Sequence, residues 1–268
     1  MKTVLQLLKI IAAAYILICV LLYFIQEKLI FFPEKLAADH VFVFDQPFEE
    51  IRLKTKDNTL LSGVLFKTGN AKGLIFYLHG NAGSVQSWGQ VAGIYTAMQY
   101  DVFMPDYRGY GKSEGHISNE QQLYDDVQLA YDSLKNRYNE QNIIIAGYSI
   151  GTGAAAKLAS VNQPRLLLLH APYYSLTDML HHRFRIIPSF ILKYKFETNK
   201  VLPACRMPVV VFHGDQDEVI YYGSSLRLQQ LFKPADTLVT LHAQGHNGIS
   251  DNPQYITALQ KILQPAVQ

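Results

Sequence analysis

The sequence predicts an α/β protein: a mostly parallel sheet with helices on both faces, an N-terminal transmembrane helix before it and a short cap-like insertion within it. Three observations support this prediction. A long apolar segment free of charge lies near the N-terminus. Short apolar, strand-like segments then alternate with helical ones, which is typical of chains that wind a parallel sheet. A serine flanked by glycines stands where one such strand meets the next helix.

The first element is the N-terminal helix, because residues 10–25 hold no charged side chain and have about the length that crosses a bilayer. No small-residue cleavage site follows the apolar run, which favours a retained anchor over a cleaved signal peptide. We predict that residues 1–32 form a membrane anchor with a juxtamembrane segment. The alternative is a buried helix of the globular domain.

The orientation of this anchor depends on the positive charges at its two ends. Lys2, Lys9 and the amino terminus precede the charge-free run, and Lys28 and Lys35 follow it. Positive charge tends to stay on the cytoplasmic side of a membrane. The small excess at the N-terminal end predicts an extracytoplasmic catalytic domain.

Residues 33–268 are predicted to form one catalytic domain that begins with antiparallel strands at the sheet edge. These strands are expected at 41–44, 51–54 and 60–67, with Asp57 and Asn58 forming the turn between the second and the third. The run at 73–78 is continuously apolar and predicts a strand covered on both faces. Further strands are expected at 102–105, 143–146, 166–169, 209–212 and 237–241, and helices at 84–99, 118–138, directly after Ser149, at 224–232 and from Pro253.

The segment 172–203 interrupts this alternation. It carries aromatic side chains at Tyr173, Tyr174, Phe184 and Phe190 between basic and apolar residues. We interpret it as a cap-like or lid-like insertion over the sheet.

Composition excludes several classes of function. The chain is 49% hydrophobic and 17% charged, below the roughly 25% charge of an average soluble domain. Its net charge of +2, without a strong Lys/Arg cluster, argues against a nucleic-acid partner. Cys19 and Cys205 are not expected to form a disulfide. Neither cysteine nor histidine spacing suggests a metal site, and we expect no metal and no other cofactor.

The motif Gly-Tyr-Ser-Ile-Gly at residues 147–151 follows an apolar strand and opens a helix rich in small residues. This is the context of a nucleophile elbow, a tight turn that projects a serine hydroxyl from the sheet edge. Ser149 is therefore the candidate nucleophile. The alternative is a solvated serine in a glycine-rich turn.

A serine needs a base to take its proton and a carboxylate to orient that base. Asp217 is the candidate acid, because it follows the strand at 209–212 and so lies at the edge of the sheet where sites of this kind are built. Asp215 is the rival. A turn or capping role for Asp217 is the alternative interpretation.

His246 is the candidate base, because it lies in a loop after the last strand and can reach both the serine and the carboxylate. His242 and His79 also follow strands. We expect His242 to be a surface or supporting group and His79 to be a structural hydrogen-bonding residue.

An acyl-transfer site also needs donors for the oxyanion of its tetrahedral intermediate. The segment 79–84 follows the first parallel strand and resembles the loop that supplies one backbone N–H, while the residue after the nucleophile supplies the other. These donors are the main-chain groups of Asn81 and Ile150. A helix-capping turn with Ser84 as the cap fits the same sequence and is compatible with this role.

These motifs together resemble the α/β-hydrolase superfamily. Its Bem46-like branch, which includes the α/β-hydrolase domain-containing proteins of types 13 and 17, is similar to this chain at residues 106–115, which read Asp-Tyr-Arg-Gly-Tyr-Gly-Lys-Ser-Glu-Gly. The segments 213–220 and 245–247 match that branch's acid and base segments, and 29–33 matches its juxtamembrane segment. The resemblance runs from Phe31 to the end of the chain. It implies Asp217 rather than Asp215 as the acid and an activity on acyl substrates. The 106–115 segment itself is expected to be structural, with glycine turns and an Arg-centred network.

We therefore expect a membrane-anchored serine hydrolase that cleaves carboxylic ester or thioester bonds through an acyl-enzyme. Its expected partners are a small-molecule or acylated, lipid-like substrate and the membrane that receives the N-terminal helix. A peptidase or a small-ester esterase is the alternative among enzymes. A catalytically inert, membrane-anchored binding module is the alternative from another class.

Overall fold

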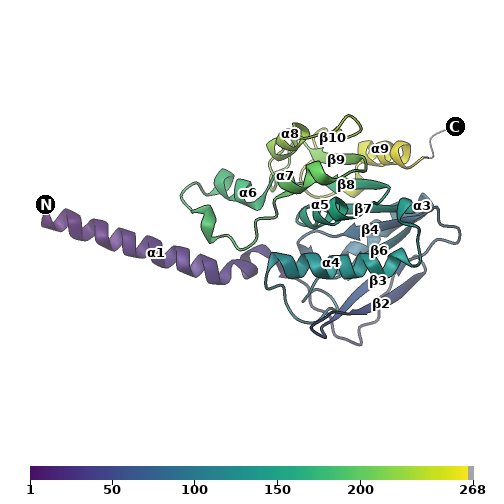
Figure 1. Ribbon diagram of the computed structural model, residues 1–268, viewed down its shortest axis with the longest axis horizontal. Coiled ribbons are helices and arrows are strands. Elements are labelled where there is room, and N and C mark those ends of the chain that lie inside the picture. The colour runs from purple at the N-terminus through teal and green to yellow at the C-terminus, as the bar shows by residue number, and fades with distance from the viewer. Residues whose placement is uncertain (265–268) are drawn as a thin grey trace.

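The computed structural model describes residues 1–264 and shows an α/β domain from which one long helix projects (Figure 1). The strands are β1 (Phe32–Pro33), β2 (Phe48–Lys54), β3 (Leu60–Phe66), β4 (Leu74–Leu78), β5 (Ala82–Gly83), β6 (Asp101–Pro105), β7 (Ile143–Tyr148), β8 (Leu166–His170), β9 (Val209–Gly214) and β10 (Thr237–Leu241). The α-helices are α1 (Lys2–Ile30), α2 (Val85–Trp88), α3 (Ala92–Ala97), α4 (Glu120–Lys135), α5 (Gly151–Val161), α6 (Leu176–Arg183), α7 (Thr198–Val201), α8 (Gly223–Gln229) and α9 (Pro253–Leu263). Short 3₁₀ turns are η1 (Gly89–Val91), η2 (Glu140–Asn142), η3 (Ser189–Ile191), η4 (Leu202–Ala204) and η5 (Ile249–Asp251).

The central sheet has the strand order β10-β9-β8-β7-β4-β6-β3-β2 within residues 1–264. The β2 strand pairs antiparallel with β3, and β3 pairs antiparallel with β6. The remaining neighbours are parallel. The predicted parallel sheet with an antiparallel edge is confirmed, and the carboxyl ends of the parallel strands meet along one edge.

Helices cover both faces of the sheet, and the middle strand β4 shows why. Leu74 and Phe76 pack into the same apolar cluster as side chains of α4 and α5. Ile75 and Tyr77 face the opposite cluster, which includes side chains of α3 and α9. Because successive strand residues point to opposite faces, a strand covered on both sides needs the unbroken apolar run seen in the sequence.

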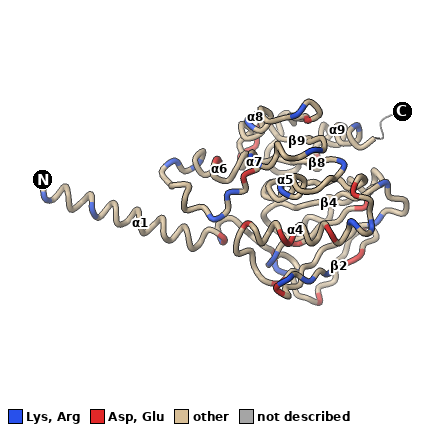
Figure 2. Tube along the Cα trace, in the orientation of Figure 1, with Lys and Arg blue, Asp and Glu red and all other residues tan. Residues whose placement is uncertain are grey.

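The α1 helix extends away from the domain, with a long uncharged stretch between charged residues near both ends (Figure 2). Its most apolar 18-residue window has a mean hydropathy of 2.6, and none of that window is buried. The helix is therefore a candidate membrane anchor by length and composition. The alternative of a buried core helix is wrong, because no residue in this window is buried by the domain.

Three features differ from the sequence prediction. Residues 41–44 form no strand, although Phe42 is buried and Val43 is exposed. This alternation results from aromatic packing, since the rings of Phe42 and Phe44 stack at a centroid distance of 5.6 Å. The helix expected at 84–99 is divided into α2, η1 and α3. The β1 strand pairs in parallel with β5, which was not predicted.

Candidate active site

The turn between β7 and α5 gives Ser149 a left-handed backbone, with φ at +51°. Residues with a Cβ rarely adopt this conformation, and it costs free energy that the surroundings must offset. Both flanking positions require glycine, because backbone carbonyl oxygens lie too close to leave room for a Cβ. A Cβ at Gly147 would lie 2.7 Å from the Gly151 carbonyl oxygen, and one at Gly151 would lie 2.3 Å from that of Leu78. The motif thus forms the sharp strand-to-helix turn that presents the Ser149 side chain at the carboxyl edge of the sheet.

The structure brings Ser149, His246 and Asp217 together from the segments that follow β7, β10 and β9. Ser149 Oγ lies 3.0 Å from His246 Nε2, and His246 Nδ1 lies 2.8 Å from Asp217 Oδ2. All three residues are less than 10% exposed. In the arrangement that satisfies both contacts, the serine hydroxyl donates to Nε2 while the Nδ1–H donates to the carboxylate. This is the geometry in which an imidazole can accept the serine proton.

The Asp217 carboxylate is held by four donors. Its Oδ1 accepts hydrogen bonds from the backbone N–H groups of Val219 and Ile220, both at 2.8 Å. Its Oδ2 faces His246 and also His213 Nε2, which is 3.2 Å away. Burial alone would raise the pKa of Asp217, but hydrogen bonds from His213 and His246 outweigh it and hold that pKa well below its usual range. The group is therefore a carboxylate at neutral pH.

The rival candidates contact each other instead of Ser149. His242 Nδ1 lies 3.0 Å from Asp215 Oδ2, and the His242 side chain is 74% exposed. The other oxygen of Asp215 accepts a hydrogen bond from the Ala243 N–H at 2.8 Å. No third ligand stands beside this pair, since residues 1–264 contain no group of three or more His, Cys, Asp or Glu side chains arranged to hold a metal ion. The Asp215–His242 pair therefore lies at the surface, where its contacts stabilise the turn at residues 242–243.

The candidate oxyanion donors occupy neighbouring strand ends. Asn81 follows β4 and Ile150 follows β7, and these two strands are paired in the sheet. Among residues 1–264, neither backbone N–H has a hydrogen-bond acceptor, so both are free to donate to a substrate. Ile150 also precedes the first turn of α5, whose N-terminus favours negative charge. Ser84 caps α2 by accepting from the Gln86 N–H at 3.2 Å, so the capping role and the oxyanion role coexist.

The loop that carries Asn81 is tied to the segment after α1. Asn81 Oδ1 accepts from the Phe32 N–H at 3.3 Å and from the Tyr110 hydroxyl at 3.2 Å. The Glu34 N–H donates to the Gly83 carbonyl at 2.9 Å, and the Glu34 carboxylate accepts from the Ser84 hydroxyl at 2.7 Å. The juxtamembrane chain is thus part of the support of the candidate oxyanion loop. Sequence reasoning missed this support, because a two-residue strand has no periodicity to detect.

Three further side chains support the site and were given no role from the sequence. Tyr148 donates its hydroxyl to the His246 carbonyl, and Glu218 Oε2 accepts from the His246 N–H at 3.2 Å. His213 is fully buried, with Nδ1 2.6 Å from Ser225 Oγ. The position of His213 in the same short segment as Asp217 was the only available signal. A histidine four residues before the acid has no recognisable role until the turn brings the two together.

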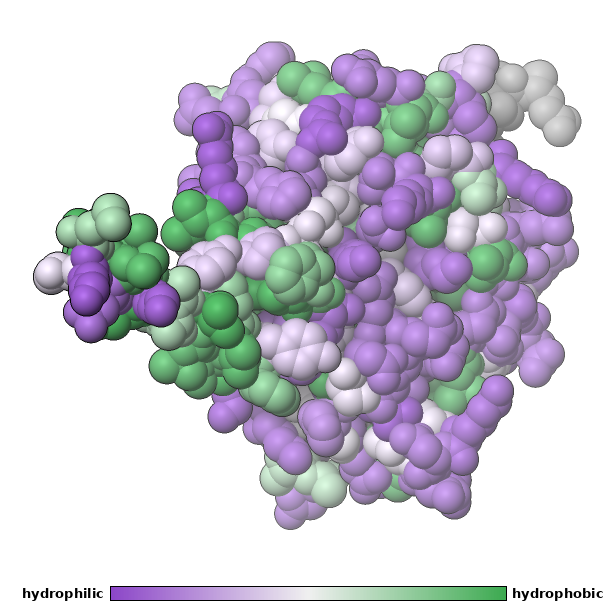
Figure 3. Space-filling view, turned by 60° about the vertical axis from the view of Figure 1, so that its left-hand side comes forward, coloured by the Kyte–Doolittle hydropathy of each residue, from purple (hydrophilic) through white to green (hydrophobic). Residues whose placement is uncertain are grey.

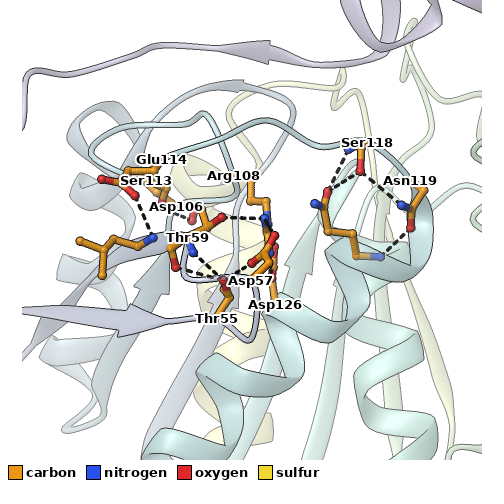
Figure 4. Close-up of polar contacts among 12 residues, drawn as sticks. Thr55, Asp57, Thr59, Asp106, Arg108, Ser113, Glu114, Ser118, Asn119 and Asp126 are labelled. Atoms are coloured by element: carbon orange, nitrogen blue, oxygen red, sulfur yellow. Dashed lines mark hydrogen bonds and ion pairs between the residues drawn. The ribbon is translucent and has the colours of Figure 1, made fainter.

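The 106–115 segment contains the expected Arg-centred network (Figure 4). Arg108 Nε donates to Asp126 at 2.5 Å, and its terminal nitrogen donates to Asp57 at 2.7 Å and to Thr59 at 3.0 Å. These contacts join the β2–β3 turn to α4. Arg108 makes none of the contacts of Ser149, His246 or Asp217 described above, which agrees with a structural role.

A second buried acid–histidine pair lies beneath the candidate oxyanion loop. His79 Nε2 is 3.7 Å from Asp106 Oδ1, and both side chains are fully buried. His79 Nδ1 is 2.7 Å from the Gly80 carbonyl, which agrees with the structural role expected for this histidine. Burial lowers the pKa of His79 to about 4 and raises the pKa of Asp106 to about 7. Between these values both groups are neutral.

This pair leads to a prediction about stability and pH. The folded protein keeps a proton on Asp106 up to about pH 7, whereas the unfolded chain releases it near pH 4, so the stability contributed by this group falls as the pH rises through that range. An Asp106→Asn variant lacks this loss. Its unfolding free energy relative to the wild type should rise by more than about 1 kcal/mol between pH 4.5 and pH 8. Denaturant titrations at several pH values measure the difference. Asp215→Asn is the exposed control, and a fall in the Asp106 difference would instead indicate a charged pair with His79.

The fold and the arrangement at the sheet edge define an α/β hydrolase. The chain matches the Hydrolase_4 family model, described as serine aminopeptidase, S33, over residues 69–203. It is also 30% identical over 201 residues to alpha/beta hydrolase domain-containing protein 17B of Homo sapiens, an alignment that covers 72% of this chain and 67% of that protein. The same protein from Xenopus tropicalis gives the same identity and coverage. The chain therefore belongs to the Hydrolase_4 family of α/β hydrolases, and its resemblance to the type 17 proteins is confirmed.

Solved structures share the fold at lower sequence identity. The esterase Pf2001 of Pyrococcus furiosus superimposes with a TM-score of 0.69 at 18% identity, covering 87% of this chain and 97% of the esterase. An α/β hydrolase of Vibrio vulnificus gives a TM-score of 0.67 at 22% identity, covering 81% of this chain and 80% of that one. At these identities the comparison supports the fold.

Proposed function

We propose that this chain is a serine hydrolase that cleaves carboxylic ester or thioester bonds, with Ser149 as nucleophile, His246 as general base and Asp217 as the acid that orients the base. The main support is the unbroken line of contacts from Ser149 through His246 to Asp217, at 3.0 and 2.8 Å. A solvated serine in a glycine-rich turn would need neither a buried imidazole nor a buried carboxylate beside it. The membership in a hydrolase family agrees with this activity.

The mechanism follows from these contacts. His246 Nε2 takes the hydroxyl proton while Ser149 Oγ attacks the carbonyl carbon, and the oxyanion that forms accepts hydrogen bonds from the N–H groups of Asn81 and Ile150. When the intermediate collapses, the bond to the alcohol or thiol breaks and the imidazolium returns its proton to the leaving group. Water then attacks the acyl-enzyme in the same way, with His246 taking its proton. The bond to Ser149 Oγ breaks, the imidazolium returns the proton to Oγ, and the carboxylic acid product leaves. Asp217 stays ionised throughout and stabilises the imidazolium.

Lipid-like or acylated substrates fit this proposal best. The α1 helix is a candidate anchor that would hold the catalytic domain at a bilayer, where such substrates concentrate. The insertion 172–203, which we propose as the cap of the 33–268 domain, exposes apolar side chains at Phe184, Ile186 and Phe190. Parts of this insertion contact α1. We also propose that the catalytic domain lies on the extracytoplasmic side, because slightly more positive charge precedes residue 10 than follows the apolar run. A C-terminal alkaline phosphatase fusion would be active on that side and inactive on the other.

Acyl-chain preference separates this proposal from the other enzymes considered. With p-nitrophenyl esters below their micellar concentrations, kcat/KM should be at least about tenfold higher for octanoate and dodecanoate than for acetate, because each added methylene can gain binding in an apolar site. A preference for acetate would indicate a small-ester esterase. The description of the matched family as serine aminopeptidase makes an aminoacyl p-nitroanilide the necessary comparison. Faster turnover of that amide than of any ester would indicate a peptidase, and turnover of none would favour an inert binding module.

A further inference from the structure

An exposed apolar segment lies in the middle of the insertion, where it follows α6 and includes η3. We call residues 184–191 the insertion tip. Phe184, Ile186 and Phe190 are 57%, 78% and 82% exposed. Three large apolar side chains exposed so fully within seven residues are unusual for a surface that only water contacts.

The insertion tip is fixed against α1 by polar contacts. The Tyr15 hydroxyl donates to the Ile186 carbonyl at 2.5 Å, and Gln26 Nε2 donates to the Ile191 carbonyl at 3.1 Å. The Gln26 side chain also accepts from the Lys193 N–H at 2.8 Å. Eleven residues separate Tyr15 from Gln26, so at about 1.5 Å per residue the tip follows α1 for roughly 16 Å.

This position brings the tip beside the part of α1 that carries no charge. An apolar groove of about 400 Å³ runs between them, lined from α1 by Tyr15, Val20 and Phe24 and from the insertion by Pro188 and Phe190, among others. Figure 3 shows the apolar surface of α1 continuing onto the adjoining part of the domain. If α1 crosses a hydrocarbon layer of about 30 Å, the tip cannot stay outside it.

The tip and the residues that flank it in the sequence carry only basic charges. Arg183, Arg185, Lys193 and Lys195 lie within residues 179–196, and this stretch contains no Asp or Glu. Lys193 reaches back to the end of α1, where it pairs with Glu27 at 2.9 Å and lies 4.7 Å from the Tyr23 ring centre. Basic side chains around an apolar segment favour anionic lipid headgroups above an apolar interior.

We propose that the insertion tip is a second membrane-contact element, which enters the same leaflet as the C-terminal half of α1 while the basic side chains around it meet anionic lipid phosphates. Two separate contacts with the bilayer, α1 and the tip, fix how the catalytic domain sits on the surface. With α1 as the only contact, the tilt of the domain relative to the bilayer would be unconstrained. The proposal rests on α1 as the anchor and is independent of the catalytic roles of Ser149 and His246.

Site-specific fluorescence tests this contact in the full chain. In a Cys19→Ala background, where the remaining Cys205 is buried, Ile186→Cys and Phe190→Cys are labelled with an NBD thiol reagent. The protein is reconstituted into vesicles of phosphatidylcholine and phosphatidylglycerol with or without nitroxide lipids. Labels at 186 and 190 should show blue-shifted emission and lose intensity with the nitroxide lipids. Val161→Cys, 62% exposed at the end of α5, is the matched control and should do neither.

Two results would overturn the proposal. Water-like emission at 186 and 190 would mean that the tip stays in solvent, and blue-shifted emission without lipid quenching would mean that protein, such as a second copy, covers it. Vesicles without phosphatidylglycerol should quench the labels less. Equal quenching with and without this anionic lipid would show that the basic side chains do not bind anionic headgroups. Fluorophosphonate labelling of the same samples reports on the catalytic site separately, so a failed membrane contact and a failed activity can be distinguished.

Discussion

Replacing Ser149 by alanine should lower kcat for an ester substrate by about 10⁴-fold or more, because no other group at the site can form the acyl-enzyme. The hydroxyl lies 3.0 Å from His246 Nε2, and no other serine has this contact within residues 1–264. Steady-state hydrolysis of p-nitrophenyl octanoate by protein purified in detergent provides the measurement. The variant should fold like the wild type, because alanine removes one oxygen and keeps the Cβ at the strained position.

Ser160→Ala is the matched control for this change. Ser160 lies on α5, the helix that follows the Ser149 turn, and its hydroxyl donates to the Lys157 carbonyl at 2.7 Å. Its activity should stay within about twofold of the wild type, as expected for a surface substitution away from the site. Equal activity in Ser149→Ala and wild type would contradict the assignment of the nucleophile.

Exchanging Asp217 for asparagine should lower kcat by about 10⁴-fold. The Oδ1 position accepts two backbone N–H groups at 2.8 Å, so the asparagine oxygen must take that place and its NH₂ must face His246. An NH₂ group there donates to Nδ1 and moves the imidazole proton to Nε2. The Nε2–H then faces the Ser149 hydroxyl and cannot accept its proton. The loss is therefore a change of tautomer, and it should appear in kcat far more than in KM.

The same substitution two residues earlier is the control. Asp215→Asn alters the exposed pair with His242 and leaves the buried contacts of Asp217 intact. It should change kcat by less than about twofold. A large loss in Asp215→Asn with a small one in Asp217→Asn would make Asp215 the orienting acid.

The sequence predicts those parts of this protein that local patterns specify. The apolar runs that became β4 and β7 place a covered strand on each side of the sheet's centre, and the glycines around Ser149 predict the sharp turn between strand and helix. The order of acid and base along the chain then brings Asp217 and His246 to the same edge. These features depend on residue type and spacing, which a sequence displays directly.

Other features depend on contacts between distant segments. The Phe32–Pro33 strand has no pattern of its own and exists because the Asn81 loop offers it a partner. His213 contacts Asp217 only after the turn at 214–217 has formed. The prediction of a strand at 41–44 was wrong. Phe44 packs on Phe66 at a centroid distance of 4.9 Å, and the backbone of residues 41–44 pairs with no strand among the described residues. In each case tertiary packing decides the outcome.

Labelling of the full chain with a fluorophosphonate probe determines whether His246 activates Ser149 as a nucleophile. Wild type, His246→Ala and the surface control His242→Ala are treated in parallel, and the modified peptide is identified by mass spectrometry. We expect modification of Ser149 in the wild type and in His242→Ala, and strongly reduced modification in His246→Ala. Folded wild-type protein that remains unlabelled, or that is labelled at a different serine, would contradict it.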